Sequence, residues 1–271
     1  MTDAAKPNPL DLGCGTLVPV RWSKLCVVYK YDHNGSCAPN VVEDKPFEMH
    51  VLVQTTRGRW YFQGKKGGQE VDSSLLVAGV QGDHYGCRHD RRYGDSNLIA
   101  SLRRDALDQD DEPLFGRQTL PAAVAPALER AIGAETEDMF DSRVFEIFDR
   151  VSIASLRATR SGRSSSLRMQ RAKRFIEAHA FEDLALADVA SCLNLSPFSC
   201  LRQFKASTGL TPHAYMSSRR LQRAQQLLKD SALSISNVGA SVGIRDQCYF
   251  ARWFARETGM APGQFRKNLR R

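Results

Sequence analysis

The sequence lacks a long apolar run, a paired-cysteine pattern and a secretory leader. No stretch approaches the roughly 18 apolar residues that a membrane span requires. The opening letters MTDAAKPNPLDLGCG contain an early acid and no apolar core, so they are not typical of a signal peptide. The seven cysteines are odd in number and show no CxxC spacing, which excludes a disulfide framework. These absences predict a cytoplasmic protein with free thiols and no membrane partner.

Positive charge is concentrated in the last two-fifths of the chain. From Ser161 onward there are 18 Lys and Arg against 7 Asp and Glu, whereas the rest of the chain has 20 against 23. The length of 271 residues and the hydrophobic content of 42% suit two soluble domains. The asymmetry predicts a module that binds a polyanion, joined to a module with another task. A solvated basic surface is the alternative interpretation.

The N-terminal half is predicted to be all-β. Segments rich in Val, Tyr, Phe and Leu alternate with turn signals such as DHNGS and GKKGG, and they cover residues 25–31, 48–55, 59–64, 74–80 and 97–103. Short strands at this spacing predict a small barrel or sandwich. Its inward-facing residues would line a ligand pocket, and the expected lining is Met49, Val51, Trp60, Phe62, Tyr85 and Cys87.

Helices are predicted from about residue 120 to 158. One apolar stripe within residues 120–134 consists of Leu120, Val124, Leu128 and Ile132. A second stripe has the 4-3-4-3 spacing of a coiled-coil seam and consists of Phe140, Val144, Ile147, Val151 and Ala154. The seam has two interpretations, packing on its own domain or dimerisation with a second copy.

A polar, Ser-rich segment at residues 159–166 predicts a linker. It would separate a sensor and dimerisation domain at residues 1–158 from a second domain at residues 167–271. The second domain is predicted to be all-α and to contain an internal duplication, at about residues 184–209 and 233–259.

Each copy of the duplication has the spacing of a helix-turn-helix. Ala190 lies four residues before Asn194, and Gly239 lies four residues before Gly243. Two helices that cross steeply need a small side chain at the crossing and a turn residue that tolerates positive φ. Asn and Gly tolerate that conformation best. The small and turn positions therefore predict two helix-turn-helix units.

The second helix of each copy has its own start and stop signals. Ser196 and Asp246 are expected N-caps, and Pro197 suits a first helical position. Gly209 and Gly259 are expected to end the two helices, each followed three residues later by a proline. The inward faces are expected to match as Cys200, Leu201 and Phe204 in one copy and Tyr249, Phe250 and Phe254 in the other.

The segments LSPFSCLRQFKASTGLTPHAYMSSRRLQRAQQLL and SISNVGASVGIRDQCYFARWFARETGMAPGQFRK resemble the DNA-binding domain of AraC/XylS-type transcription regulators. The family's Arg-Leu-x-x-Ala-x-x-Leu-Leu motif is present as Arg220-Leu221, Ala224 and Leu227-Leu228. The resemblance implies that this motif lies in a long helix joining the two units. It also implies that the two recognition helices enter adjacent major-groove segments on one DNA face, about 34 Å apart.

The sequence departs from that family at three positions. Gly239 stands where Ala is usual, Ile244 where Phe is usual, and Ala255 where Lys is usual. The last departure removes a phosphate contact from the second unit and does not affect the fold.

The outward faces of the recognition helices carry the residues predicted to contact DNA. Arg202 and Arg252 occupy equivalent positions, and a guanidinium can donate two parallel hydrogen bonds to guanine. A phosphate contact is the alternative for each arginine. Phe198 is expected to contact a thymine methyl group. The full predicted set is Phe198, Ser199, Arg202, Gln203, Lys205, Gln247, Cys248, Arg252 and Arg256.

The strand-rich half resembles, less specifically, the cupin-like sensor domain of these regulators. Gly82-Asp83-His84 approximates their Pro-Gly-x-x-His turn without the proline. The His-x-His metal pattern of cupins is absent, so neither an enzyme nor a cofactor is expected. Cys87 has three interpretations: a zinc ligand with His89 and His50, a redox-sensing thiol activated by nearby arginines (Arg88, Arg91 and Arg92), or an ordinary core or pocket cysteine.

The sequence therefore predicts a cytoplasmic, sequence-specific DNA-binding transcription regulator that controls promoter binding or activation. Its expected partners are double-stranded promoter DNA, a small-molecule effector, RNA polymerase and a second copy of the chain. The alternative is the same regulator controlled by oxidation or metal at Cys87 and His89. A cupin-type enzyme tethered to DNA is a third reading, which the missing metal pattern disfavours.

Overall fold

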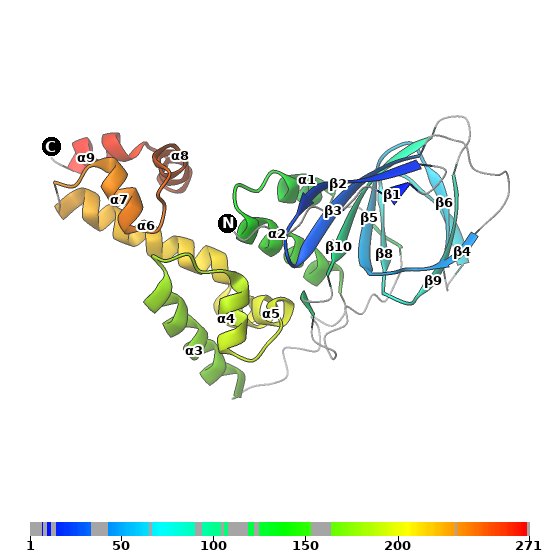
Figure 1. Cartoon of the computed structure of the whole chain (residues 1–271), viewed down its shortest axis with the longest axis horizontal. Helices are drawn as coiled ribbons and strands as arrows, with labels where there is room; N and C mark the ends of the chain where they lie inside the picture. The colour runs from blue at the N-terminus through cyan, green and yellow to red at the C-terminus, as the bar shows by residue number, and fades with distance from the viewer. Residues whose placement is uncertain are drawn as a thin grey trace. The chain divides into compact units, whose positions relative to one another are not determined.

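The computed structural model describes residues 7, 10–11, 15–33, 43–64, 67–89, 94–103, 106–107, 119–121, 125–152, 164–230 and 232–269. The chain divides into an N-terminal unit, residues 1–160, and a C-terminal unit, residues 161–271. Strands followed by two helices build the N-terminal unit, and helices alone build the C-terminal unit (Figure 1). Within the described residues, every helix is too short or too polar to cross a bilayer.

The N-terminal unit contains two antiparallel sheets. The seven-stranded sheet has the order β1 (Leu10–Asp11), β2 (Gly15–Trp22), β3 (Cys26–His33), β10 (Asp95–Leu102), β5 (His50–Arg57), β8 (Leu75–Gly79) and β11 (Thr119–Pro121). The four-stranded sheet has the order β4 (Glu43–Pro46), β9 (His84–His89), β6 (Trp60–Gly64) and β7 (Gly67–Val71). The five predicted strands are confirmed as β3, β5, β6, β8 and β10. The described strands form two sheets, so a closed barrel is not confirmed.

An apolar cluster lies between the two sheets. Its buried residues come from the β4–β5 connection and from strands of both sheets, and they are Phe47, Val51, Val53, Trp60, Phe62, Val71 and Val77. Partly buried side chains pack against them, among them Met49, Tyr85 and Cys87. Phe47 and Tyr85 stack with ring centroids 4.1 Å apart. The cluster is one of the hydrophobic cores of the N-terminal unit, since the helices that follow the strands bury further apolar side chains.

Two helices follow the strands, and the first begins later than predicted. α1 covers Ala125–Ile132, whereas Leu120 belongs to β11 and pairs with Leu76. A short apolar run fits a helix or a buried strand equally well, so its spacing alone misassigned residues 120 and 121. Val124, Ala154 and residues 159–163 of the predicted linker lie outside the described residues. Residues 164–166 of that linker are already helical.

The predicted seam lies on α2, Glu137–Val151, and is already covered within one chain. Phe140, Val144 and Ile147 are at most 2% exposed. The Arg21 guanidinium lies over the Phe140 ring at 5.6 Å, which places this face of α2 against the β2 side of the sheet. A buried stripe has no free surface for a second copy. These three members of the stripe therefore pack on their own domain, and dimerisation through the helices of residues 120–158 stays a prediction.

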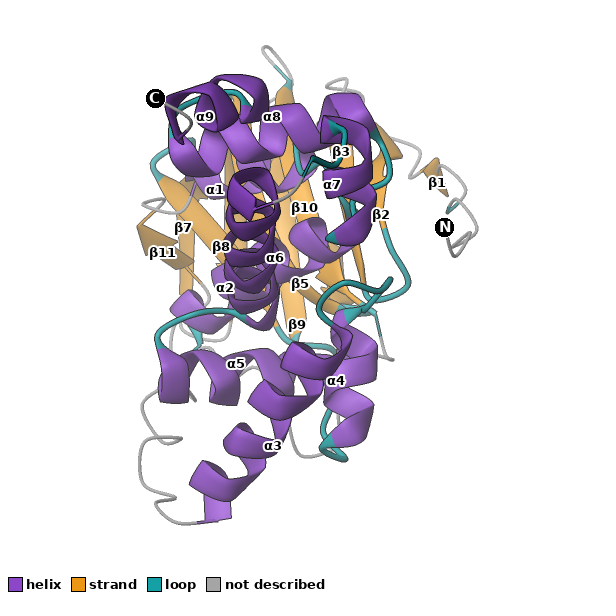
Figure 2. Cartoon of the chain, turned by 90° about the vertical axis from the view of Figure 1, so that its left-hand side faces the viewer, coloured by secondary structure: helices purple, strands orange, loops and turns teal. Residues whose placement is uncertain are grey.

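The C-terminal unit consists of seven helices among its described residues: α3 (Ser164–His179), α4 (Leu186–Cys192), α5 (Pro197–Thr208), α6 (Pro212–Asp230), α7 (Ile235–Ser241), α8 (Gln247–Thr258) and α9 (Pro262–Leu269). α6 has 19 residues and spans about 28 Å at 1.5 Å per residue. α3, α4 and α5 gather at one end of α6, and α7, α8 and α9 at the other (Figures 1 and 2). The pairs α4–α5 and α7–α8 are the two predicted helix-turn-helix units.

Candidate nucleic-acid interface

The two turns have the predicted backbone geometry. Asn194 has φ of 52° and is the one non-glycine residue with positive φ in the described part of the chain, and Gly243 has φ of 77°. At the crossing, Ala190 is 1% exposed. A Cβ placed on Gly239 would lie 2.8 Å from the Ile244 carbonyl oxygen, which is too close. Glycine at position 239, the departure from the family pattern, therefore reflects a tighter crossing in the second unit.

The N-caps of the recognition helices are also confirmed. The Ser196 hydroxyl accepts a hydrogen bond from the Ser199 N–H at 3.1 Å. The Asp246 carboxylate accepts one from the Tyr249 N–H at 2.7 Å. Each bond satisfies a backbone donor that the first helical turn leaves without a partner. Pro197 occupies the start of α5, as predicted.

The repeated Thr-Gly sequence has a structural cause in both units. Thr208 Oγ1 donates to the Phe204 carbonyl at 2.8 Å, and Thr258 Oγ1 donates to the Phe254 carbonyl at the same distance. The next residues, Gly209 and Gly259, cap the helices with φ of 75° and 78°. Positive φ favours glycine at these positions. The two repeats therefore end their recognition helices by the same local device.

The prolines that follow do more than prevent continuation of the helix. Pro212 begins α6 and Pro262 begins α9. Proline suits a first helical turn because its missing N–H would have no partner there. The repeated motif thus ends one helix and starts the next within four residues.

The inward faces differ from the prediction at one position. Cys200, Leu201 and Phe204 are fully buried on α5, as expected. On α8 the third large buried side chain is Trp253, 3% exposed, whereas Tyr249 is only partly buried. The Trp253 indole N–H reaches the Ser217 hydroxyl on α6 at 3.1 Å, so this ring anchors α8 to the joining helix.

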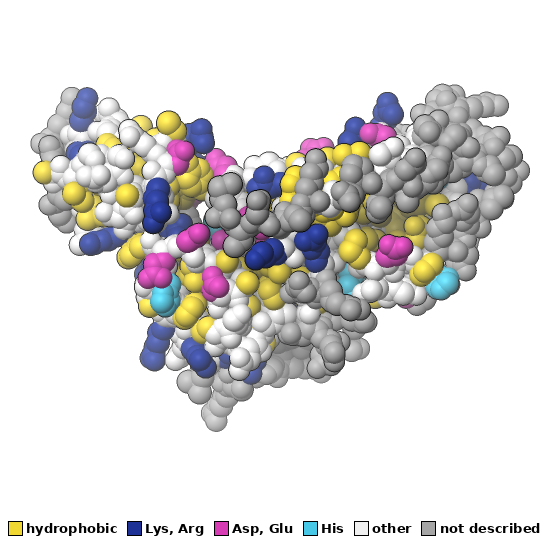
Figure 3. Space-filling model, viewed as in Figure 1, with side chains coloured by type: hydrophobic (Ala, Val, Ile, Leu, Met, Phe, Trp, Pro, Cys, Tyr) yellow, Lys and Arg dark blue, Asp and Glu magenta, His cyan; other side chains and the backbone are white. Residues whose placement is uncertain are grey.

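The outward face of α8 is accessible. Gln247, Cys248, Arg252 and Arg256, the four residues predicted there, are all exposed. Lys and Arg side chains are scattered over the visible surface of the helical unit rather than gathered in one patch (Figure 3). Scattered positive charge attracts a polyanion without selecting a sequence. Sequence selection requires the particular side chains of this face.

The outward face of α5 departs from the prediction. Phe198 is fully buried and Ser199 is 5% exposed, so the expectation that both side chains are open to bases is wrong. Burying a phenylalanine ring stabilises a protein by about 1.5–3 kcal/mol, which favours an inward Phe198. The Arg202 guanidinium lies 5.7 Å from the Phe198 ring centroid. Arg202, Gln203 and Lys205 are partly buried and remain the candidate contacts of this helix.

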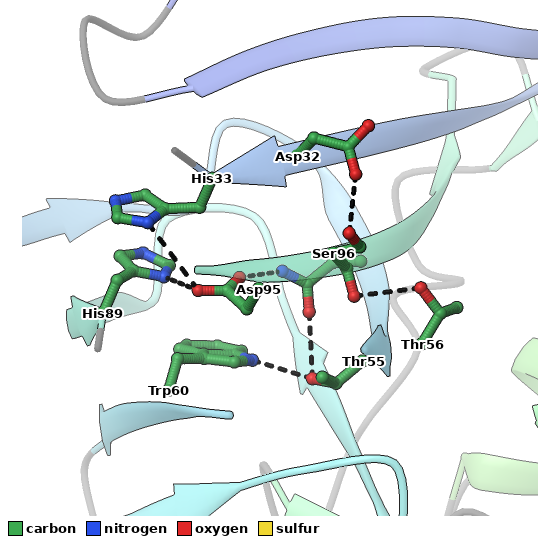
Figure 4. A network of polar contacts seen from close by, with 9 residues as sticks. Asp32, His33, Thr55, Thr56, Trp60, His89, Asp95 and Ser96 are labelled. Atoms are coloured by element: carbon green, nitrogen blue, oxygen red, sulfur yellow. Dashed lines mark hydrogen bonds and ion pairs between the residues drawn. The ribbon is translucent and has the colours of Figure 1, made fainter. Parts of the chain in front are cut away.

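The N-terminal unit contains a buried polar network that the sequence did not indicate. His33 from β3, His89 from β9 and Asp95 from β10 meet there (Figure 4). His89 Nδ1 lies 2.6 Å from Asp95 Oδ2, and the Asn97 amide donates to Asp95 Oδ1 at 2.5 Å. Beyond Asn97, the bonds continue to Thr55 and the Trp60 indole N–H, as Figure 4 shows.

The two histidines of this network have pKa values shifted in opposite directions. Burial acts to lower the pKa of His89, but hydrogen bonds to Asp95 and Cys87 outweigh it and raise that pKa to about 9. Burial, with the adjacent positive charge of His89, lowers the pKa of His33. At neutral pH the pair therefore carries one imidazolium, which is hydrogen-bonded to the Asp95 carboxylate.

The positions of the histidines contradict the zinc alternative for Cys87, in which His89 and His50 were the further ligands. His50 pairs with Leu102 at one end of β10, whereas Asp95, which contacts His89, lies at the other. Seven residues of strand separate the two ends by about 23 Å. One ion cannot reach both histidines.

His33, His89 and Asp95 offer ligand atoms within 4.8 Å of one another. The two rings, however, are stacked at 4.1 Å with 16° between their planes. The nitrogen lone pairs lie in those planes and do not converge on one point as a tetrahedral zinc site requires. The arrangement fits a shared proton better than a shared metal.

The interpretation of Cys87 as a redox-sensing thiol required nearby arginines, and Arg88, the neighbouring one, points away from it. Arg88 is exposed on the opposite face of β9, and its guanidinium lies over the Tyr61 ring at 5.0 Å. Cys87 instead packs against the core cluster, and the other five residues predicted to line a pocket either belong to this cluster or pack against it. Arg91 and Arg92 lie outside the described residues.

The comparisons with known proteins concern the C-terminal unit. A family model described as a helix-turn-helix domain matches residues 189–268. The MmsAB operon regulatory protein of Pseudomonas aeruginosa is 33% identical over 108 residues, which are 40% of this chain and 35% of that protein. The transcriptional activator RhaR of Salmonella arizonae is 45% identical over 65 residues, 24% of this chain and 23% of the activator.

A solved structure is also similar over this region. It is a transcriptional regulator from Chromobacterium violaceum described as AraC-type, with 27% identity, 39% of this chain and 95% of that chain covered, and a TM-score of 0.36. The chain spans only about a third of the length of the first curated relatives it matches. Residues 189–268 of this protein therefore match a helix-turn-helix domain and are similar to the regulators named above.

Proposed function

We propose that this chain is a sequence-specific DNA-binding transcription regulator in which α5 and α8 read adjacent stretches of one duplex. The observation that carries the proposal is the duplicated geometry. Two turns and two N-capped recognition helices, each ending at a glycine C-cap, are joined by one helix. The exposed Arg252 and Gln247 on α8 supply side chains suited to guanine and adenine. The relatives named as regulators, which match this region, support the proposal.

The direct test is Arg252→Ala in the full chain, on a duplex selected by the wild-type protein from random DNA. We expect a loss of about 1–3 kcal/mol on the selected duplex and little change on unrelated DNA, because a base contact carries sequence information. Fluorescence anisotropy at fixed salt measures both affinities. The matched control is Lys229→Ala, which removes one exposed positive charge from α6. Equal weakening on both duplexes would assign Arg252 to phosphate and contradict base reading.

The proposal includes a small-molecule effector between the two sheets of the N-terminal unit. An apolar, aromatic interior with a few fixed polar groups is typical of ligand sites, and the network around Asp95 and Asn97 provides such groups. Binding of RNA polymerase and of a second copy belongs to the same proposal, from the family resemblance.

A thermal-shift panel of small metabolites tests the effector. A stabilising compound should slow hydrogen exchange in peptides from β5, β6 and β9, because those strands contribute the cluster. Compounds that protect only peptides of α3 to α9 would contradict a site between the sheets.

A further inference from the structure

The segment that follows α3 contacts the turn of the second helix-turn-helix. The carbonyl groups after a helix end have no helical partner. Arg220, on α6, donates from Nε to the Ala180 carbonyl oxygen at 2.6 Å and from Nη2 to the Glu182 carbonyl oxygen at 2.7 Å. The planar guanidinium thus spans two carbonyls, with Phe181 between them. Arg220 therefore ties the end of α3 to the joining helix.

The turn of the second helix-turn-helix packs on the same segment. A Cβ on Gly243 would lie 2.7 Å from the Phe181 carbonyl oxygen and 3.2 Å from Arg220 Nη2. The Gly243 backbone is therefore in close contact with both. The Phe181 side chain is 40% exposed, so the contact depends on its backbone rather than on its ring.

The other contacts of α6 show that Arg220 lies between the two helix-turn-helix units. Earlier on α6, Tyr215 and Arg219 hold α3 through Glu177, with an Arg219–Glu177 distance of 2.7 Å. The apolar core of the second helix-turn-helix is built from the later part of α6, α7 and α8, and its buried members are Ala224, Leu228, Val238, Val242, Ile244, Phe250, Trp253 and Phe254. None of these comes from α3, α4 or α5. The two helix-turn-helix units therefore have separate cores, and Arg220 lies where they touch.

We propose that Arg220 is a positioning residue that fixes the direction of α8 relative to α5 through the Phe181–Gly243 contact. The inference rests on the proposed function, since it concerns how two recognition helices reach one duplex. Gly243 lies three residues before the Asp246 cap of α8, so a shift at this turn changes the direction of a helix about 18 Å long. Arg220 thereby sets the spacing of the two DNA elements that the chain accepts.

The test uses Arg220→Lys in the full chain, because lysine keeps the charge but cannot donate from two separated nitrogens. The probes are the selected duplex, two duplexes with one element scrambled, and one duplex with a base pair inserted between the elements. We expect Arg220→Lys to weaken binding of the selected duplex about tenfold, the scale of one lost charge-assisted hydrogen bond. Binding of each single-element duplex should change by less than about twofold, since the separate cores are intact.

The decisive measurement is the spacing penalty, which is the loss of affinity caused by the inserted base pair. A residue with a merely structural role would leave this penalty unchanged. Wild-type protein should lose affinity on the inserted duplex, and Arg220→Lys should lose much less. Gly243→Ala, which adds the clashing Cβ, should reproduce this pattern, and thermal unfolding of the same preparations checks that the variants are folded.

Two results would overturn the inference while leaving the proposed function intact: an unchanged spacing penalty in both variants, or equal weakening on all four duplexes. A wild-type selection that enriches no sequence would overturn the proposed function, and this inference with it.

Discussion

Replacing Phe254 by alanine should lower the free energy of unfolding of the C-terminal unit by about 3–5 kcal/mol, the usual cost of removing a buried aromatic ring. Phe254 is fully buried and lies against Phe250 and Phe265, with ring centroids 5.9 Å and 5.3 Å away. A loss of this size is a large fraction of the stability of an ordinary domain. Because the ring fixes α8 on its core, we also expect sequence-specific DNA binding to be lost.

Hydrogen exchange measured by mass spectrometry localises the effect. Peptides from α6 to α9 should exchange faster in Phe254→Ala, and those from β5 and β10 should not. The control is Leu233→Ala in the same unit, which removes a side chain that is 37% exposed and should change stability by no more than about 0.5 kcal/mol. Equal effects of the two substitutions would contradict the assignment of Phe254 to the core.

Asp95→Ala should destabilise the N-terminal unit by about 3–5 kcal/mol near pH 6.5, because it removes the carboxylate that balances the buried charge of His89. Asp95 is fully buried and accepts hydrogen bonds from His89 and Asn97. Denaturant unfolding followed by exchange of β3, β9 and β10 peptides measures the change. Asp32→Ala is the control: this carboxylate is 49% exposed, pairs with Lys30, and should contribute less than about 1 kcal/mol.

The effect of Asp95→Ala should depend on pH in a defined direction. The pKa of His89 is raised in the folded state to about 9, above the ordinary value of 6.5. A raised pKa means that the stabilisation is fully present below about pH 6.5 and is lost as the pH rises through 9. The difference in unfolding free energy between wild type and Asp95→Ala should therefore shrink between these values. A difference that stays constant or grows would show that His89 does not carry the charge.

The helix-turn-helix units were predictable because their determinants are local. The φ values of Asn194 and Gly243, the caps at Ser196 and Asp246, and the glycine stops each depend on residues within a few positions. Local rules of this kind can be read directly from sequence spacing. The exposure of α5 could not be read in the same way. Helical spacing placed Phe198 outward, whereas the fold buries it.

The polar network of the N-terminal unit was missed for the opposite reason. His33, His89 and Asp95 lie on three strands and come together only through strand pairing, in which Asp95 is directly opposite His33. Alternation along a strand predicts which face a residue occupies and not which residue of another strand it meets. The expectation that Cys87 faces inward is consistent with its packing against the core cluster, whereas the zinc alternative joined it to His50, which lies at the other end of β10 from Asp95.

The most direct test of the account is selection by the full wild-type chain from a library of random duplex DNA, at fixed salt concentration. Two recognition helices on one joining helix predict an enriched sequence with two short elements whose centres lie about 10–10.5 base pairs apart. Enrichment of such a pair would support base reading by both α5 and α8. Binding without any enriched sequence would mean that the duplicated helix-turn-helix only holds DNA, and the central claim would be contradicted.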